Sequence, residues 1–223
     1  MGAPAAAAGP APSASVAAMT TTLPLPALPF DLTPVPAGSW RVAPDGVVHG
    51  EGGPRTDIFI DPGSAGAESL LNAATALGEP PAGDYQFSAR VTVDFAATFD
   101  AGVLLLWADE RNWAKLCFEY SPAGQPMIVS VVNRGVSDDA NAFDVAGNTV
   151  WLRVARIGDA YAFHASTDGA AWHLIRVFVL ADGAPAPVLV GLEAQSPTGD
   201  GCAVTFDEIR FAAERLADLR DLS

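Results

Sequence analysis

With 223 residues, half of them hydrophobic and only 17% charged, the chain can form one large apolar core without a disulfide or a metal. Its formal charge of −14 excludes nucleic acids and anionic membranes as expected partners, because the 12 basic residues occur singly and build no basic patch. No run approaches the ~20 apolar residues that cross a bilayer, so we expect no membrane segment.

Residues 1–38 are rich in Ala, Pro and Thr and almost uncharged, a composition that predicts a disordered or extended tail. Its small residues are similar to those of a secretory signal, but the basic n-region and the dense apolar core of such signals are missing. We therefore expect a cytoplasmic protein. Within the tail, the Leu/Pro-rich run at 23–30 has the composition of an extended edge segment that docks on the folded domain.

From Trp40 onward, β-branched and aromatic runs alternate with Gly, Asp, Asn and Pro clusters, which predicts an all-β domain over 39–211. We expect a two-sheet antiparallel sandwich in which the apolar runs 102–108 and 127–132 are central strands covered on both faces. The expected strands are 40–43, 47–50, 57–60, 69–77, 84–95, 102–108, 112–120, 127–133, 149–157, 160–166, 173–180, 187–194 and 202–211.

Helical periodicity occurs only in the segment 212–223, where Leu216 and Leu219 share a face, so we expect a short C-terminal helix there. Cys117 and Cys202 belong to no Cys-x-x-Cys pair and the histidines lack metal-ligand spacing, so we expect no cofactor and no metal. Two buried thiols in a reducing compartment and a disulfide across the sheets both remain open.

Several short motifs follow one another in order between residues 40 and 211. They are Arg55-Thr56-Asp57, Phe99-Asp100-Ala101-Gly102, Trp113-Ala114-Lys115 with Glu119, 129–133, Ser137-Asp138, 151–154, 166–169 with Trp172, Arg176, and Val190-Gly191 before Ser196-Pro197. In this order they resemble a domain family of unknown function that includes the regulator-of-enolase proteins and belongs to the concanavalin A-like lectin/glucanase superfamily.

The resemblance implies a concanavalin A-like jelly-roll sandwich with one concave sheet, and a carbohydrate-related or metabolic-regulatory role without established catalysis. Two positions depart from the family pattern. Asp139 stands where an aromatic residue usually follows Ser-Asp, and Ala101 stands where Gln often follows the aspartate of the Asp-x-Gly element. Any ligand contact that relatives make through those two side chains is therefore altered in this chain.

The stretch 112–120 carries the candidate ligand site. Pleat alternation puts its mainly apolar residues, Ala114, Leu116, Phe118 and Tyr120, on one face, and Trp113, Lys115, Cys117 and Glu119 on the other. An aromatic ring beside an ammonium and a carboxylate is a mixture that sugar recognition uses, and a dry core excludes it unless the charges are paired. Further candidates on neighbouring strands are Trp107, Arg153, Arg176, Glu193 and Gln195. The alternative is an outer-face Lys115–Glu119 pair, with Trp113 half-covered by a loop.

Two loops invite a functional reading. Ser137-Asp138-Asp139 is a candidate rim element of the ligand site; its oxygens suit Ca²⁺, but the spacing is not that of a metal loop, and turn capping accounts for it better. The element from Ser166 to Trp172 is explained by a hairpin turn that Asp168 closes.

Three functions fit these features. The leading hypothesis is a non-catalytic lectin-like module that binds a small carbohydrate or sugar-derived metabolite on the Trp113/Lys115/Glu119 face, with a metabolic regulatory role. The second function is a glycoside hydrolase or lyase, which needs two carboxylates ~5 Å apart. The neighbours Asp207 and Glu208 are expected to point to opposite faces of a strand, so Glu119 and Glu193 are the remaining candidates for such a pair. The third function is a protein-interaction module for a metabolic enzyme or a second copy of the chain, with the acidic surface or the C-terminal leucines as the contact.

Overall fold

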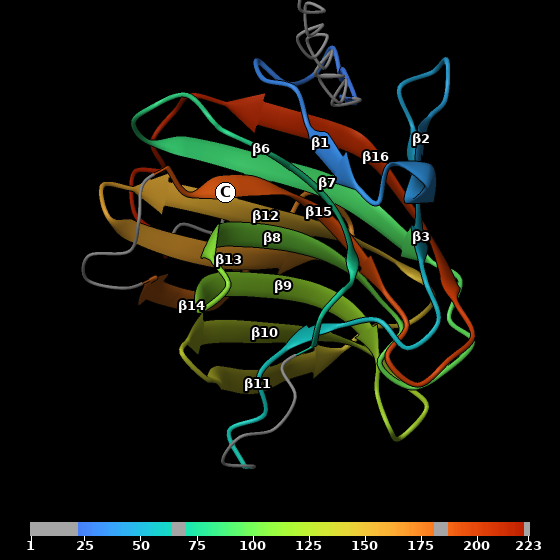
Figure 1. Cartoon of the computed structure of the whole chain (residues 1–223). Coiled ribbons are helices and arrows are strands. Elements are labelled where there is room, and N and C mark those ends of the chain that lie inside the picture. The colour runs from blue at the N-terminus through green and yellow to red at the C-terminus, as the bar shows by residue number, and fades with distance from the viewer. Residues whose placement is uncertain (1–21, 64–69, 181–186, 221–223) are drawn as a thin grey trace, which may run out of the picture.

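The computed structural model describes residues 22–63, 70–180 and 187–220, and in these residues the chain forms two seven-stranded sheets (Figure 1). We call them the front sheet and the back sheet. The front sheet contains, in spatial order, β1 (Thr33–Val35), β6 (Ala74–Gly78), β15 (Leu189–Gln195), β8 (Ala101–Asp109), β9 (Asn112–Tyr120), β10 (Pro126–Arg134) and β11 (Ser137–Asp144).

The back sheet contains, in spatial order, β14 (His173–Val179), β13 (Ala160–Ser166), β12 (Thr149–Ile157), β7 (Tyr85–Val93), β16 (Cys202–Ala212), β3 (Val48–Gly52) and β2 (Trp40–Val42). A short 3-10 turn, η1 (Ala37–Ser39), leads into β2, and β4 (Ile58–Phe59) pairs with β5 (Leu70–Leu71) outside both sheets. All strand pairs are antiparallel. The all-β, two-sheet sandwich predicted from the sequence is confirmed.

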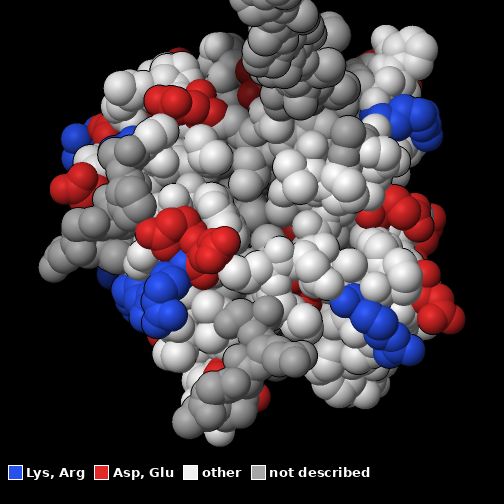
Figure 2. Space-filling model, viewed as in Figure 1, with Lys and Arg blue, Asp and Glu red and all other residues white. Residues whose placement is uncertain are grey.

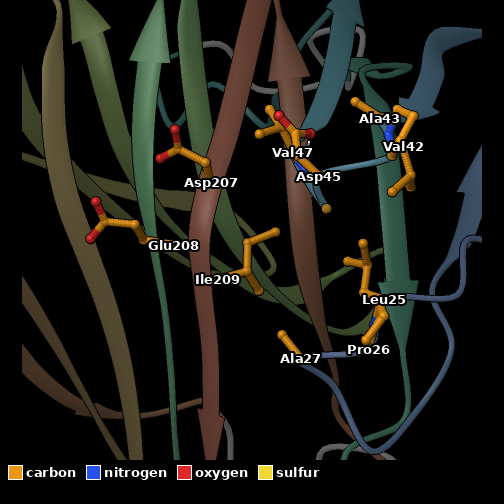
Figure 3. Close-up of a pocket in the computed structure, with 12 residues that line it drawn as sticks. Leu25, Pro26, Ala27, Val42, Ala43, Asp45, Val47, Asp207, Glu208 and Ile209 are labelled. Carbon is orange, nitrogen blue, oxygen red and sulfur yellow. Dashed lines mark hydrogen bonds between the residues drawn. The ribbon is translucent and has the colours of Figure 1, made fainter.

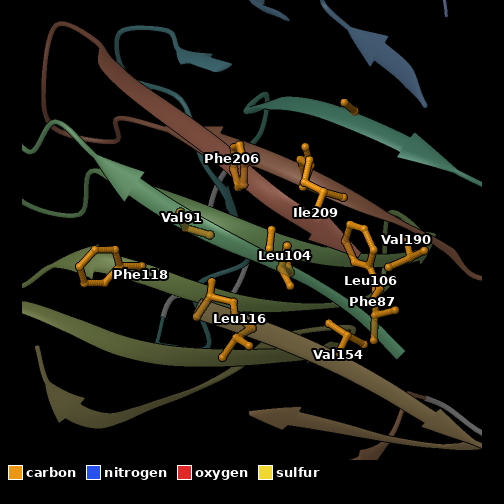
Figure 4. Packing of buried hydrophobic residues seen from close by; sticks show 14 of the residues in the cluster. Phe87, Val91, Leu104, Leu106, Leu116, Phe118, Val154, Val190, Phe206 and Ile209 are labelled. Atoms are coloured by element: carbon orange, nitrogen blue, oxygen red, sulfur yellow. The ribbon is translucent and has the colours of Figure 1, made fainter. Parts of the chain in front are cut away.

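The core lies between the two sheets and follows from the alternation of apolar residues. In β7, every second residue from Tyr85 to Val93 is buried and the residues between them are half-buried. These side chains meet Leu104 and Leu106 of β8 and Leu116 of β9 across the interior (Figure 4). Burying one such side chain stabilises the fold by about 1.5–3 kcal/mol, so this layer dominates the stability of the domain.

The central strands of the front sheet are buried on both faces, as their continuous apolar runs predict. A second apolar cluster covers the outer face of this sheet, away from the core, where Ile58 and Ala73 pack on residues such as Val103 and Leu105. The cover comes from the segment around β4 and β5, blue-green in Figure 1, which we call the flap (residues 55–63 and 70–73).

The described part of the N-terminal stretch is extended and packs on the sandwich. Leu23 and Leu32 form an antiparallel bridge, and β1 pairs with β6 at the edge of the front sheet. Leu23, Leu25, Leu28 and Leu32 are buried in the main core. The packed domain therefore begins before residue 39, and the run at 23–30 lies against it.

The C-terminal helix expected over 212–223 is wrong for the residues that the structure describes. Strand β16 continues to Ala212, and residues 213–220 contain no helix. A helix this short nucleates poorly, whereas the observed path buries Leu216 and brings the Leu219 carbonyl to 3.0 Å from Nε2 of His164. Residues 221–223 lie outside the described chain.

Two further findings complete the fold. Cys117 and Cys202 are both buried and free, so the disulfide alternative is wrong. No helix in the part of the chain that the structure describes has the length and hydrophobicity needed to cross a membrane.

Candidate functional site

The pleat of β9 places side chains as the sequence predicts. Ala114, Leu116 and Phe118 lie in the core between the sheets, while Trp113 and Cys117 belong to the cluster on the outer face. The register extends this face across neighbouring strands. Glu119 lies opposite Ala101, which lies opposite Gln195, and Cys117 lies in the next row with Val103 and Glu193. Lys115, Glu119, Glu193 and Gln195 therefore share one face, as expected.

The flap covers part of this face, and this changes the role of Trp113. The Trp113 side chain is 0% exposed and packs with Ile58 and Ala73. Two hydrogen bonds between Ile60 and Ser137 fix the flap there, since the Ile60 amide donates to the Ser137 hydroxyl at 2.9 Å and the Ser137 amide donates to the Ile60 carbonyl at 3.0 Å. The expected orientation of Trp113 is correct but its expected exposure is wrong, so its ring cannot stack on a ligand.

Lys115 is the centre of a buried polar cluster beneath the flap. Its Nζ donates to Oδ1 of Asp57 and to Oε1 of Gln195, both at 2.9 Å, and lies 3.9 Å from Oε1 of Glu193. The side chain is only 2% exposed. Burial opposes its charge, but attraction to Asp57 and Glu193 outweighs this and raises the pKa of Lys115 above its ordinary value. The ammonium therefore stays protonated and holds the flap to the sheet.

The carboxyl groups around Lys115 are in excess. Burial raises the pKa of Glu193 to about 8, and neither of its oxygens has a hydrogen-bond partner among the described residues. Burial likewise raises the pKa of Glu119 to about 8, with Lys115 opposing and Asp139 adding to the shift. The pKa of Asp139 is raised by the same cause. At neutral pH the cluster therefore carries protonated carboxyls that can donate as well as accept hydrogen bonds.

A pocket of about 170 Å³ opens beside this cluster, and we call it the polar pocket. The front sheet contributes Lys115, Glu119, Val131 and Gln195, the edge strand β11 contributes Asp139, the flap contributes Asp57 and Phe59, and Phe99 comes from the loop before β8. Two aromatic rings thus border the same hollow as an ammonium, an amide and three carboxyls. The volume is below the ~300–1,000 Å³ of sites for drug-sized ligands, so it suits a small molecule.

A strained turn presents Phe99 to the polar pocket. Phe99 has a φ of 69°, a left-handed conformation that bulky residues rarely adopt, and its side chain is 38% exposed. The buried carboxylate of Asp100 fixes the turn, because one oxygen accepts the amides of Ala96 and Ala97 at 2.9 and 2.8 Å and the other accepts the Ser196 hydroxyl at 2.6 Å. The Phe99 carbonyl also accepts Nε2 of Gln195 at 3.1 Å. The turn and the polar cluster are therefore built as one unit.

Three predicted site residues lie elsewhere. Trp107 is on the same outer face but lines a different pocket on the other side of the flap. Arg153 lies on the outer face of the back sheet, where its guanidinium stacks 4.4 Å from the Trp172 ring centroid. Arg176 of β14 reaches the edge of the front sheet, with Nη2 2.8 Å from Oδ2 of Asp138. The expectation that these residues join Trp113 and Lys115 in one site is wrong. The flap lies between Trp107 and the polar pocket, Arg153 faces the opposite side of the sandwich, and Arg176 links the edges of the two sheets.

The candidate loop at 137–139 is a strand. Ser137, Asp138 and Asp139 begin β11, the edge strand beside β10, and not a capped turn. Their side chains diverge, since the Ser137 hydroxyl is buried and donates to Asn133 at 3.3 Å, while Asp138 binds Arg176. Among the described residues no group of three or more His, Cys, Asp and Glu side chains is placed to hold a metal ion.

The neighbours Asp207 and Glu208 reach one partner, contrary to the prediction. A bulge in β16 gives Glu208 a φ of 47°, and both carboxylates bind Arg90, at 2.6 and 3.1 Å. They border a pocket of about 540 Å³ whose other walls include Leu25 and Ile209 (Figure 3). In this view Glu208 points away from those apolar side chains. Because these acids are already paired, we do not assign this pocket a ligand.

The surface charge agrees with the composition. On the face viewed in Figure 2, Lys and Arg side chains occur as small separate groups and do not merge into one basic surface. Acidic side chains lie between and beside them. This face therefore lacks the continuous positive potential that a polyanion needs.

Sequence reasoning missed Asp57, Phe59 and Phe99 as pocket residues, and of the candidate rim residues 137–139 only Asp139 lines the pocket. Asp57 and Lys115 are 58 positions apart, so no local pattern connects them. Asp57, Phe99 and Asp100 do stand in the ordered motifs, and this was the signal available for them.

A family described as "Protein of unknown function (DUF1349)" matches residues 35–214. A functionally unknown protein from Saccharomyces cerevisiae is 24% identical with a TM-score of 0.68, and the match covers 78% of this chain and 95% of that chain. No curated protein matches the chain.

Two larger solved structures share the fold. The GH43 protein from Bacillus licheniformis is 18% identical with a TM-score of 0.64, covering 83% of this chain and 37% of that one. The xylan beta-1,4-xylosidase from Bacillus halodurans C-125 is 13% identical with a TM-score of 0.57, covering 74% and 32%. The chain spans about a third of their length, so this likeness concerns the sandwich alone.

Proposed function

This chain belongs to the DUF1349 family of proteins of unknown function, and from that premise we propose that it binds a small neutral carbohydrate in the polar pocket. The observation that carries the proposal is the composition of that pocket. Phe59 and Phe99 offer apolar ring faces, while Glu119, Asp139 and Gln195 offer hydrogen-bonding groups beside them. Sugars present an apolar ring face and a rim of hydroxyls, so this pairing matches both parts of the ligand.

The charges of the pocket favour a neutral ligand over a sugar phosphate. The Lys115 ammonium is already bound to Asp57 and Gln195, so it has little attraction left for an incoming anion. The remaining pocket charges are carboxyls. The volume of about 170 Å³ suits a single sugar ring better than a chain.

Binding without hydrolysis is the version we propose. Glu193 is 0% exposed and does not line the polar pocket, so it cannot reach a scissile bond there together with Glu119. The fold also occurs within a GH43 protein and a xylan beta-1,4-xylosidase, which supports sugar as the ligand class. A metabolic regulatory role in the cytoplasm belongs to the same proposal, and the free thiols of Cys117 and Cys202 are in keeping with a reducing compartment.

Saturation-transfer NMR with D-xylose, D-glucose and glucose 6-phosphate tests the proposal on the full chain. We expect contacts with a neutral sugar and weaker contacts with the phosphate. Phe99→Ala should weaken binding about fivefold or more, because losing an aromatic contact is worth about 1 kcal/mol. Phe143→Ala is the matched control, since Phe143 lies on β11 and contacts His173 edge-to-face, outside the pocket. Absence of contact with every sugar, or equal binding by Phe99→Ala, would overturn the proposal.

A further inference from the structure

The flap divides the outer face of the front sheet into two hollows. Asp57 and Phe59 border the polar pocket, and Ile58, between them in β4, borders a second pocket of about 600 Å³. Alternate residues of a strand point to opposite sides, so β4 forms a wall between the two. We call the second hollow the apolar pocket. Nothing in the proposed sugar site uses it.

The floor of the apolar pocket is open because of one glycine. In the register of the front sheet, Leu77 lies opposite Gly191, which lies opposite Leu105, so the middle of this row carries no side chain. A Cβ on Gly191 would lie 2.0 Å from the Ala76 carbonyl oxygen. The backbone therefore holds this hollow in place, and no larger residue can fill it without moving two strands.

The walls are suited to an apolar body. Ile58, Leu71 and Ala73 come from the flap, while Leu77, Leu189 and Trp107 come from the sheet. Trp107 is half-buried, and Val35 at the edge is 58% exposed. A volume near 600 Å³ with aromatic and aliphatic walls lies within the range of small-molecule sites.

One side of this pocket carries two unpaired acids. Leu189 lies opposite Trp107, Val190 opposite Gly78, and Leu77 opposite Thr33. Glu79 directly follows Gly78, Asp31 lies two residues before Thr33, and both acids line this pocket. The Asp31 carbonyl lies against Gly78, so the two acids are at the same end of the pocket. Trp107 is on β8, two strands away from β6, which corresponds to about 10 Å across the sheet.

These two carboxylates have no counter-charge in the described chain. Neither Asp31 nor Glu79 makes a side-chain hydrogen bond or an ion pair there, and no Lys or Arg lines the pocket. Two like charges at the same end of a pocket repel each other. A cation between them would relieve this repulsion, whereas an anionic ligand would add to it.

We propose that the apolar pocket binds a small molecule with an aromatic or aliphatic body and one ammonium group. The body packs on Trp107 and the flap residues, and the ammonium lies between Asp31 and Glu79. The distance across the sheet between the two acids and Trp107 selects a ligand whose ring and ammonium are joined by a chain of several carbons. This site is separate from the sugar site and does not depend on it.

Three probes that share a phenyl ring on a four-carbon chain and differ only in their terminal group measure the effect of ligand charge on binding. We would titrate the full chain with 4-phenylbutylamine, 4-phenylbutanol and 5-phenylvalerate and follow Trp indole NMR signals. The amine should bind about tenfold or more tightly than the carboxylate, with the alcohol between them. The double variant Asp31→Asn/Glu79→Gln should lose this preference and still bind the alcohol.

A second variant tests the position of the ammonium. Thr33→Lys places a side-chain ammonium among the pocket-lining residues beside the two acids, so it should abolish amine binding while the protein stays folded. Phe99→Ala should leave amine binding unchanged, which separates this site from the polar pocket. Equal affinities for the three probes, no binding of the amine, or unchanged amine binding by the Thr33→Lys or the double variant would overturn the proposal.

Discussion

The outer faces of the two sheets both carry charged residues on apolar strands, but they use them differently. On the back sheet the charges find partners on the same face, since Arg90 binds Asp207 and Glu208, and Arg153 stacks on Trp172. On the front sheet one ammonium, Lys115, meets several carboxyls.

A polar residue within an apolar strand therefore does not by itself mark a ligand site. The balance of charges around it does. The back-sheet charges are satisfied where they stand, whereas the front-sheet cluster leaves both oxygens of Glu193 without hydrogen-bond partners among the described residues and lies beside a pocket. Four experiments test whether the two faces differ in this way.

The largest effect should come from removing the central cation. Lys115→Met leaves buried acids without their partner, which destabilises a protein by about 3–5 kcal/mol. Arg90→Met removes an ion pair that is about one-third exposed on the back sheet, and such pairs contribute about 0–1 kcal/mol. Urea unfolding of both variants measures the difference. Similar losses would remove the distinction between the two faces.

The pH dependence of stability should have opposite signs on the two faces. Glu193 has its pKa raised to about 8 when folded, so the folded chain keeps a proton that the unfolded chain releases above about pH 4.5. Stability therefore falls as the pH rises from about 4.5 to about 8, by up to about 1.4 kcal/mol per pH unit for this group. Glu193→Gln should flatten the curve of Tm against pH in this range.

On the back-sheet side, Asp168 titrates in the other direction. Backbone hydrogen bonds from Ala171 and Ala170 lower its pKa, so its stabilising effect is present above about pH 4 and is lost in more acidic solution. Asp168→Asn should change the Tm only in the acidic range. For the front sheet, a Glu193→Gln curve of Tm against pH that keeps the wild-type slope between pH 5 and pH 8 would contradict the raised pKa of Glu193.

A smaller effect should follow from replacing Asp100 in the turn before β8 or Asp168 in the turn between β13 and β14. Asp100→Ala leaves the amides of Ala96 and Ala97 and the Ser196 hydroxyl without their buried acceptor, which costs about 1–3 kcal/mol. It should also weaken sugar binding, because this turn holds Phe99. Asp168→Ala removes similar bonds at an exposed turn, so its effect in urea unfolding should be smaller. A larger loss of unfolding free energy in Asp168→Ala than in Asp100→Ala would show that burial does not determine how much these aspartates stabilise their turns.

The smallest effect should come from the ion pair that links the edge of the front sheet to the edge of the back sheet. Asp138 is more than half exposed and binds Arg176 across the gap between β11 and β14. Asp138→Ala should therefore cost less than about 1 kcal/mol. A loss above 2 kcal/mol in urea unfolding would mean that this link organises the sandwich.

The sequence predicts much of the fold because its strands alternate clearly. The turn residues bound most strands, and the pleat of 112–120 gives the correct face for Lys115 and Glu119. Strand β11 was missed because Ser137–Asp144 contains no β-branched residue and only one aromatic, Phe143. Its pairing with the apolar strand β10 overrides this low propensity.

The site was only partly predictable, for a physical reason. Alternation along a strand gives the side on which a residue lies, but it does not say what covers that side. The flap, which buries Trp113 and supplies Asp57, comes from a distant part of the sequence. Alternation also does not determine which of the two sheets a strand belongs to, and therefore which side of the sandwich its polar residues face. For this reason Arg153 was grouped with Lys115, although the two lie on opposite outer faces.

Strand β1 has a consequence for how the molecule meets its own copies in solution. The rim of a sheet can recruit another chain through free backbone amides, a common route to aggregation. One edge of the front sheet is formed by β1, a strand of three residues with Pro34 in the middle, and Pro36 follows it. Prolines have no amide hydrogen to offer, so ribbon-like stacking of molecules along this side is disfavoured by the backbone itself.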